Sequence, residues 1–219
     1  MEVILMKELL QANDQLAAEN REYFRRRHIL AVNLMGGPGS GKTTLISAVA
    51  KELNGIRVGV IEGDIASSID ADHLEGEGIR SSQINTGGEC HLDANVIRQG
   101  ADRIDLRDAV VFIENVGNLI CPAEFDLGES VRLLAASVPE GDDKPFKYVP
   151  MFSYVDAVAL TKCDLAQAVG FDRQNFLKGL RVLSQAPVFE VSLKKGAPAQ
   201  GAGELAGWLR KQYEDLPTA

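Results

Sequence analysis

A glycine-rich segment of the chain carries residues whose types and spacing suit phosphate binding. Gly36, Gly41, Lys42 and Thr43 fit the pattern G-x-x-x-x-G-K-[ST], in which backbone N–H groups surround phosphates and the lysine ammonium reaches the terminal ones. Glycine is needed because a Cβ atom would block a backbone that curls around a polyanion. We therefore predict a P-loop here. Its predicted nucleotide-binding residues are Gly37, Pro38, Gly39, Ser40, Gly41, Lys42, Thr43 and Thr44.

Carboxylates follow two other apolar runs and predict a magnesium site. Asp64 comes shortly after residues 57–61, and Glu114 directly follows residues 109–113. Mg²⁺ takes hard oxygen ligands, and the Thr43 hydroxyl would be a third one. We predict Thr43, Asp64 and Glu114 as the Mg²⁺ ligands. For Asp64 taken alone, a helix N-cap or turn role is equally open.

Gly117, three residues after Glu114, predicts a sensor for the γ-phosphate of GTP. The acid would contact Mg²⁺ through water while the glycine amide donates to the γ-phosphate. The predicted catalytic set is therefore Lys42, Asp64, Glu114 and Gly117. Asn118 stands where Ras-like enzymes have the glutamine that orients the attacking water, so we expect slow intrinsic hydrolysis.

The segment Thr161-Lys-Cys-Asp164 lies close to the guanine-recognition pattern N-K-x-D. Asp164 can accept two hydrogen bonds from guanine, whereas adenine lacks that donor pair and would leave the carboxylate unpaired. Thr161 in place of asparagine weakens one contact to the base. We predict that Thr161, Lys162 and Asp164 bind the nucleotide. Ser192 opens the segment Ser192-Leu-Lys-Lys-Gly196, which either closes over the base or forms a solvated lysine turn.

Cys90, His91 and Cys121 flank the predicted sensor loop and suit a soft metal ion. Adjacent side chains of a strand point to opposite faces, so Cys90 and His91 could share an ion only at a bend, which Gly87 and Gly88 permit. A helix starting near His91 would lower the pKa of the Cys90 thiol. Two thiolates and an imidazole favour Ni²⁺ or Zn²⁺. Two ordinary buried thiols and a surface histidine are the alternative.

Composition favours a single α/β domain. The 219 residues are 45% hydrophobic, which is enough to bury a full core. A formal charge of −8 argues against nucleic acid or an anionic membrane as a partner. No apolar run approaches the roughly 18 residues of a membrane span, and no export signal is evident. We therefore expect a cytoplasmic protein whose three cysteines form no disulfide framework.

Helical patterns alternate with apolar runs, which predicts a mostly parallel sheet with helices on both faces. Ligands of such a sheet bind at the carboxyl ends of the strands, where the residues described above lie. We divide the chain into an N-terminal helical extension, residues 1–28, and a P-loop domain, residues 29–219. The predicted strands start from the apolar runs at 29–35, 57–61, 109–113, 131–138, 155–160 and 187–191.

Five blocks of the sequence together resemble the HypB family of nickel-incorporation GTPases, which are P-loop GTPases of the SIMIBI class. The C-H-L-D-A and E-N-V-G-N-L-x-C-P stretches are specific to that family, and the Cys-Pro-His motif of the related urease nickel GTPases is absent. The resemblance covers nearly the whole chain, from about Asn13 to Trp208, and five blocks carry it. They are residues 36–43, 86–94, 114–122, 140–144 and 161–164.

This resemblance implies a GTPase that delivers nickel during [NiFe]-hydrogenase maturation. Cys90, His91 and Cys121 would be metal ligands where two subunits meet in the GTP state, and Lys144 would reach across the dimer toward the other nucleotide. The implied cofactors are GTP, Mg²⁺ and Ni²⁺ or Zn²⁺. The implied partners are a second copy of the chain, hydrogenase maturation proteins and the hydrogenase large-subunit precursor, with no nucleic acid and no membrane.

Two other functions are compatible with the P-loop. A small-molecule kinase would need an arginine-rich lid, for which Arg98, Arg103 and Arg107 are the clustered candidates. A metal carrier that binds nucleotide without hydrolysing it is the second alternative, and measurement of phosphate release distinguishes it.

Overall fold

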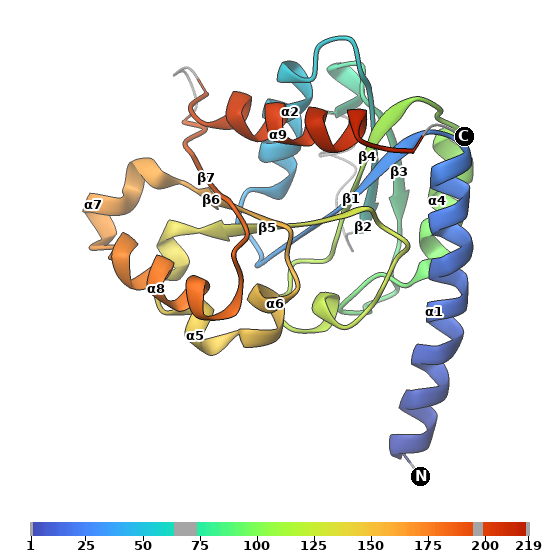
Figure 1. Cartoon of the computed structure of the whole chain (residues 1–219), viewed down its shortest axis with the longest axis horizontal. Coiled ribbons are helices and arrows are strands. Elements are labelled where there is room, and N and C mark those ends of the chain that lie inside the picture. The colour runs from blue at the N-terminus through green and yellow to red at the C-terminus, as the bar shows by residue number, and fades with distance from the viewer. Residues whose placement is uncertain (1, 64–73, 195–198, 218–219) are drawn as a thin grey trace.

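A parallel β-sheet forms the centre of the computed structural model, which describes residues 2–63, 74–194 and 199–217 (Figure 1). In this part of the chain the sheet has seven strands in the order β3-β2-β4-β1-β5-β6-β7, and each neighbouring pair is parallel. The predicted fold class is confirmed. The strands are β1 (Ile29–Gly36), β2 (Arg57–Gly63), β3 (Arg80–Ile84), β4 (Ala109–Glu114), β5 (Val131–Ser137), β6 (Ala157–Thr161) and β7 (Val188–Val191).

Helices cover both faces of the sheet. Successive side chains of β1 point to opposite faces: Leu30 and Val32 pack in the cluster that contains α2 and α9, whereas Ile29 and Ala31 pack toward α1 and α4. The helices are α1 (Glu2–Arg26), α2 (Lys42–Glu52), α4 (Ala94–Ile104), α5 (Lys144–Lys147), α6 (Val149–Ser153), α7 (Ala166–Val169), α8 (Arg173–Leu183) and α9 (Ala202–Glu214), with short 3₁₀ turns η1 (Cys121–Ala123), η2 (Val138–Glu140) and η3 (Cys163–Leu165).

Helix α1 is fastened to the rest of the domain by buried side chains. Phe24 is 1% exposed, and the Asn20 carboxamide donates to the carbonyl oxygens of Ala94 and Leu127 at 2.7 and 3.1 Å. Its first turns extend beyond the body of the molecule (Figure 1). Helix α1, which occupies most of the segment predicted as a helical extension, therefore lies along α4.

Strand β3 was absent from the sequence prediction. Its residues, Arg-Ser-Ser-Gln-Ile, form no apolar run because β3 is at an edge of the sheet and is only partly covered. The other six strands lie within a few residues of the apolar runs.

Because the strands are parallel, their carboxyl ends lie at the same end of the sheet, and the segments predicted to carry the site follow these ends. Strands β1, β2, β4 and β6 end there at Gly36, Gly63, Glu114 and Thr161. The segments that follow these four residues are the P-loop, the segment containing Asp64, the sensor loop and the guanine-recognition segment.

Candidate nucleotide and metal site

The P-loop curves between β1 and α2 with an open inner side. Gly39 and Gly41 have φ angles of +70° and +91°, which favour glycine, and a Cβ atom at either would meet nothing within 4 Å. Helix α2 begins at Lys42 without a side-chain cap, which leaves the amides of its first turn, at the positive end of the helix dipole, available to an anion. The Lys42 ammonium folds back over the loop, with Nζ 3.4 Å from the Gly37 carbonyl oxygen.

Two of the three predicted magnesium ligands lie together. The Thr43 hydroxyl donates to Oε1 of Glu114 at 2.9 Å, and the Glu114 side chain is buried. Asp64, the third predicted ligand, lies outside the described residues. The hard oxygen donors of Thr43 and Glu114 suit Mg²⁺.

Glu62 is a further acidic residue at this edge that the sequence analysis did not single out. It pairs in register with Glu114 across β2 and β4, so both carboxyl side chains project to the same face of the sheet, and it is 2% exposed. The sequence carried one signal for Glu62, which is a glutamate directly after a buried apolar run. A buried acid requires compensation by a cation or by hydrogen bonds, so this position is typical of a functional site.

The loop that follows β4 lies directly on the P-loop. We call residues 114–121 the switch loop. A Cβ atom on Gly117 would lie 3.0 Å from Cα of Pro38, and Asn118 forms an antiparallel bridge with Gly36. The predicted γ-phosphate sensor is therefore in backbone contact with the phosphate loop.

Gly117→Ala should lower both stability and affinity for a GTP analogue. The added methyl group would meet backbone atoms of Pro38, and such overpacking costs about 1–3 kcal/mol. Denaturant unfolding and nucleotide titration measure the two effects. Gly207→Ala on α9 is the matched control because nothing lies within 4 Å of its Cβ position. Equal effects of the two substitutions would contradict the proposed close packing.

A pocket of about 160 Å³ lies beside the P-loop where the base of the nucleotide is expected. Its lining includes Asp164 from the recognition segment and Leu193 and Lys194 from the segment after β7. The Ser192 hydroxyl accepts from the Asp164 backbone amide at 3.1 Å. The described part of the Ser192–Gly196 segment therefore borders the pocket; residues 195 and 196 lie outside the description.

Thr161 and Lys162 connect the predicted guanine-recognition segment, residues 161–164, to the P-loop. The buried Thr161 hydroxyl donates to the Ser40 carbonyl oxygen at 2.7 Å, and Nζ of Lys162 donates to the Gly39 carbonyl oxygen at 2.7 Å. Lys162 adopts a left-handed conformation with φ +58°, which is a strained geometry for a residue other than glycine. Threonine at position 161 thus supports the phosphate loop.

The structure brings the two predicted metal-binding thiols together. Sγ of Cys90 lies 2.8 Å from Sγ of Cys121, and 3.6 Å from Nδ1 of His91. The His91 ring stacks on Phe125 with centroids 3.7 Å apart. Within the described ranges, no group of three or more His, Cys, Asp or Glu side chains is arranged to hold a metal. The pair of thiols suits a soft ion, whereas the His91 ring packs against Phe125.

Two expectations about Cys90 have different outcomes. Residues 90 and 91 lie in a bend, as a shared ion requires. The expectation of a lowered thiol pKa is wrong. Helix α4 begins at Ala94 and is capped by Asp93, not near His91, and the hydrogen bond to the Cys121 sulfur, followed by partial burial, raises the pKa of Cys90. Cys90 is exposed and Cys121 half-buried, so they are not ordinary core thiols.

Lys144 and Arg98 make contacts with residues outside the P-loop. Lys144 begins α5, with its ammonium 5.4 Å from the Tyr148 ring centroid. Arg98 on α4 is paired with Asp102 and packs over the Tyr23 ring at 4.1 Å. Arg98 therefore belongs to the contact between α1 and α4, which disfavours its use in a kinase lid.

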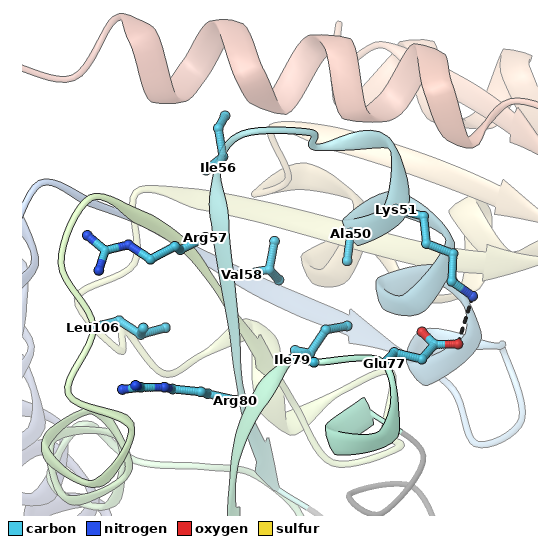
Figure 2. Close-up of a pocket in the computed structure, with 10 residues that line it drawn as sticks. Ala50, Lys51, Ile56, Arg57, Val58, Glu77, Ile79, Arg80 and Leu106 are labelled. Carbon is cyan, nitrogen blue, oxygen red and sulfur yellow. Dashed lines mark hydrogen bonds and ion pairs between the residues drawn. The ribbon is translucent and has the colours of Figure 1, made fainter.

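A second pocket, of about 320 Å³, lies at the opposite end of the sheet, where strands β2 and β3 begin (Figure 2). It opens beside the first residues of β2 and β3, between Val58, Ile79 and Leu106, and its rim carries the ion pair of Lys51 with Glu77. No P-loop or switch-loop residue lines it. This pocket is therefore separate from the candidate site.

Comparison with known proteins identifies the family. The family model for the CobW/HypB/UreG nucleotide-binding domain matches residues 30–189. The hydrogenase maturation factor HypB of Azotobacter vinelandii is 41% identical over 209 residues, which cover 94% of this chain and 68% of that protein. The chain belongs to the HypB family.

Solved HypB structures share the fold. HypB of Archaeoglobus fulgidus is 39% identical with a TM-score of 0.86, covering 93% of this chain and 100% of that one. HypB of Helicobacter pylori, solved in complex with nickel, is 34% identical with a TM-score of 0.87, covering 95% and 98% of the two chains. The HypB resemblance seen in the five sequence blocks is confirmed. The part of this HypB-family chain that the structure describes contains no helix that is long and apolar enough to span a membrane.

Proposed function

We propose that this chain is a GTP-hydrolysing metallochaperone that delivers nickel during [NiFe]-hydrogenase maturation. Cys90, His91 and Cys121 bind the transition metal, which is the cargo, at an interface between two copies of the chain. GTP occupies the P-loop and the pocket beside Asp164. The protein acts together with hydrogenase maturation proteins and the hydrogenase large-subunit precursor. This function extends to this chain the role that the names of its relatives state.

One observation carries the proposal: a single short loop joins the phosphate site to the thiol pair. The switch loop begins at Glu114, which is bonded to Thr43, and passes Pro38 at Gly117. It ends at Cys121, whose sulfur lies 2.8 Å from that of Cys90. A movement of this loop on loss of the γ-phosphate would therefore change the position of one thiol relative to the other.

The nucleotide chemistry follows from the residues at the strand ends. Lys42 and the first-turn amides of α2 bind the phosphates, and Gly117 offers its amide to the γ-phosphate. Thr43, Glu114 and Asp64 hold Mg²⁺, which would neutralise charge on the phosphate oxygens during transfer. Asp164 selects guanine. The Asn118 carboxamide donates to the Cys90 carbonyl oxygen and accepts from the Ile120 amide. Asn118 stands where Ras-like enzymes have the water-orienting glutamine, and because its side chain is engaged in these bonds, they support slow hydrolysis.

The metal site is completed by a second copy of the chain. Two thiolates and one imidazole supply three donors, whereas Zn²⁺ is almost always four-coordinate in structural sites. Ile120, directly before Cys121, is 59% exposed and provides an apolar contact for a partner. Lys144 then approaches the nucleotide of that partner.

Metal titration in the two nucleotide states tests the function. We expect the dimer to bind Ni²⁺ or Zn²⁺ with affinities that differ between a GTP analogue and GDP by about 5–150-fold, the usual range of coupling between sites. Equilibrium titration alongside mass measurement in solution gives both quantities. Equal affinities with GTP analogue and GDP would refute the switch, and absence of phosphate release from GTP would favour a carrier without turnover.

A further inference from the structure

Asn118 joins three segments of the candidate site through its side chain and its backbone. Its Oδ1 accepts from the backbone amide of Ile120 at 2.9 Å, next to Cys121, and its Nδ2 donates to the Cys90 carbonyl oxygen at 3.4 Å. The backbone of the same residue is bridged to Gly36, the first glycine of the P-loop. Asn118 thus contacts the phosphate loop and the immediate backbone of both cysteines.

Asn115 holds a second, buried connection between the same loops. Its Oδ1 accepts from the amides of Val116 and Leu92 at 2.9 and 3.3 Å, and its Nδ2 donates to Oδ1 of Asn33 at 3.1 Å. The two backbone donors fix which end of the carboxamide is oxygen, because an NH₂ group cannot accept from them. Asn115 is 2% exposed, so its position is determined by these bonds.

The chain of hydrogen bonds continues from Asn33 to the carboxylate of Glu129. Asn33 donates to Oε1 of Glu129 at 3.3 Å, and that oxygen also accepts from Nε of Arg132 at 2.6 Å. The carboxylate accepts only, so every bond from Leu92 to Glu129 runs in one direction. Each side-chain nitrogen and oxygen of Asn115 and Asn33 has a hydrogen-bond partner, and a buried network of this kind is rigid.

Leu92 is the fixed end of the segment that carries Cys90. Its amide is bonded to Asn115, and its side chain fills the space where a Cβ atom of Gly63 would lie, 2.5 Å from the nearest methyl carbon. Cys90, two residues earlier, is exposed. The thiol segment is therefore anchored at Leu92, while Asn118 contacts it near the metal-binding end.

We propose that Asn118 is the positioning residue that carries the nucleotide state of the P-loop to both thiols, with Asn115 and Leu92 as the fixed pivot. When Gly117 shifts relative to Pro38, the Asn118 carboxamide transmits the shift to the Ile120 amide and the Cys90 carbonyl, but the Cys90 segment follows less because it is anchored at Leu92. The spacing of the two sulfurs changes as a consequence. This inference rests on the proposed nucleotide-dependent metal site and adds the residue that produces the dependence.

Metal titration of Asn118→Ala tests this role. The parent should show the nucleotide-dependent ratio of Ni²⁺ affinities, whereas in Asn118→Ala the ratio should fall to within about twofold of one. Affinity for the GTP analogue should persist because the contact with Gly36 is made by the backbone. Asn85→Ala is the matched control: Asn85 accepts from the Gly87 amide at 2.9 Å within the same segment and does not contact the switch loop through any hydrogen bond described.

Asn118→Asp separates the two halves of the contact. The carboxylate keeps the acceptor for Ile120 but loses the donor to Cys90. We expect it to lose the nucleotide-dependent ratio as Asn118→Ala does, because the tie to the thiol segment is the coupling contact. An Asn118→Asp variant with the parental ratio would overturn the assignment to this bond.

Disulfide formation without metal or nucleotide gives an independent measurement. A diazene oxidant removes both thiol hydrogens: two S–H bonds break, one S–S bond forms, and the N=N bond is reduced to the hydrazine. Oxidation of Cys90 and Cys121 should be slower in Asn118→Ala than in the parent or in Asn85→Ala, because the loops are no longer held together.

The outcomes distinguish this inference from the proposed function. If the parent shows no nucleotide dependence, the switch itself fails and the role of Asn118 fails with it. If the parent shows the dependence and Asn118→Ala retains it, only the role of Asn118 is overturned. An oxidation rate of Asn118→Ala equal to that of the parent would likewise overturn it.

Discussion

Replacing Asp164 by asparagine should weaken GTP binding by roughly 10–150-fold, which corresponds to the 1.5–3 kcal/mol of a hydrogen bond to a charged group. Asp164 lines the pocket proposed for the base, and a carboxylate can accept from both guanine N1–H and the 2-amino group. Asparagine accepts through one oxygen only and places an NH₂ group against a guanine donor. The loop should keep its shape because Ser192 is bonded to the backbone amide of residue 164, not to its side chain. Calorimetric titration with GTP measures the loss.

Xanthosine triphosphate provides the matched control for this substitution. Xanthine has an oxygen where guanine has the 2-amino group, so the asparagine NH₂ gains an acceptor and affinity for this nucleotide should rise in Asp164→Asn. Metal binding by the nucleotide-free protein should not change, since the thiol pair lies on other loops. Parental GTP affinity in Asp164→Asn would show that Asp164 does not recognise the base.

The sequence predicted those parts of the molecule whose signal is local. Glycines at fixed spacing between an apolar run and a helix define the P-loop, and Glu114 and Thr161 follow buried apolar strands directly. Because parallel strands end at one edge, the proximity of these segments could be inferred without knowing the order of the strands. Residues Thr43 and Glu114 lie in hydrogen-bond contact as that reasoning requires.

Features that depend on tertiary contacts could not be read from the sequence. Strand β3 lacks an apolar run because, among the residues that the structure describes, one of its sides has no neighbouring strand. Asn33 and Glu129 lie 96 residues apart and belong to none of the five blocks, yet with Asn115 they form one buried chain. The pKa of Cys90 depends on a thiol 31 residues away, so helix-based reasoning predicted the wrong direction.

The charged end of the buried chain supports the proposed fixed pivot at Asn115 and Leu92. Glu129 is 7% exposed and accepts from the Leu127 amide and from Arg132, so the carboxylate is paired and hydrogen-bonded. Removal of one partner of such a buried group leaves an unsatisfied charge, which is costly. Movement is therefore easier in the less buried half of the switch loop, from Gly117 to Cys121, where the proposed metal ligand lies.

Cys121→Ala should lower the affinity for Ni²⁺ and Zn²⁺ by more than about 100-fold, exceeding the 10–100-fold cost of losing a partner outside the ligand set. Cys121 begins the short turn η1 and is half-buried, so alanine keeps the backbone while removing one of the two sulfurs. Affinity for GTP should stay close to the parental value because the residues that bind phosphate and base are unchanged. Competition titration with a chromophoric chelator measures the metal affinity.

Cys163→Ala is the control that separates a ligand from a generic thiol. Cys163 is also half-buried, but its thiol donates to the Leu160 carbonyl oxygen at 3.0 Å and it belongs to the predicted guanine-recognition segment. Its loss should leave metal affinity unchanged, whereas loss of Cys121 removes a donor that Cys90 cannot replace alone. If Cys121→Ala bound both ions as tightly as Cys163→Ala does, the thiol pair would not be the metal site. The switch loop would then have no metal ligand through which the γ-phosphate could affect metal binding.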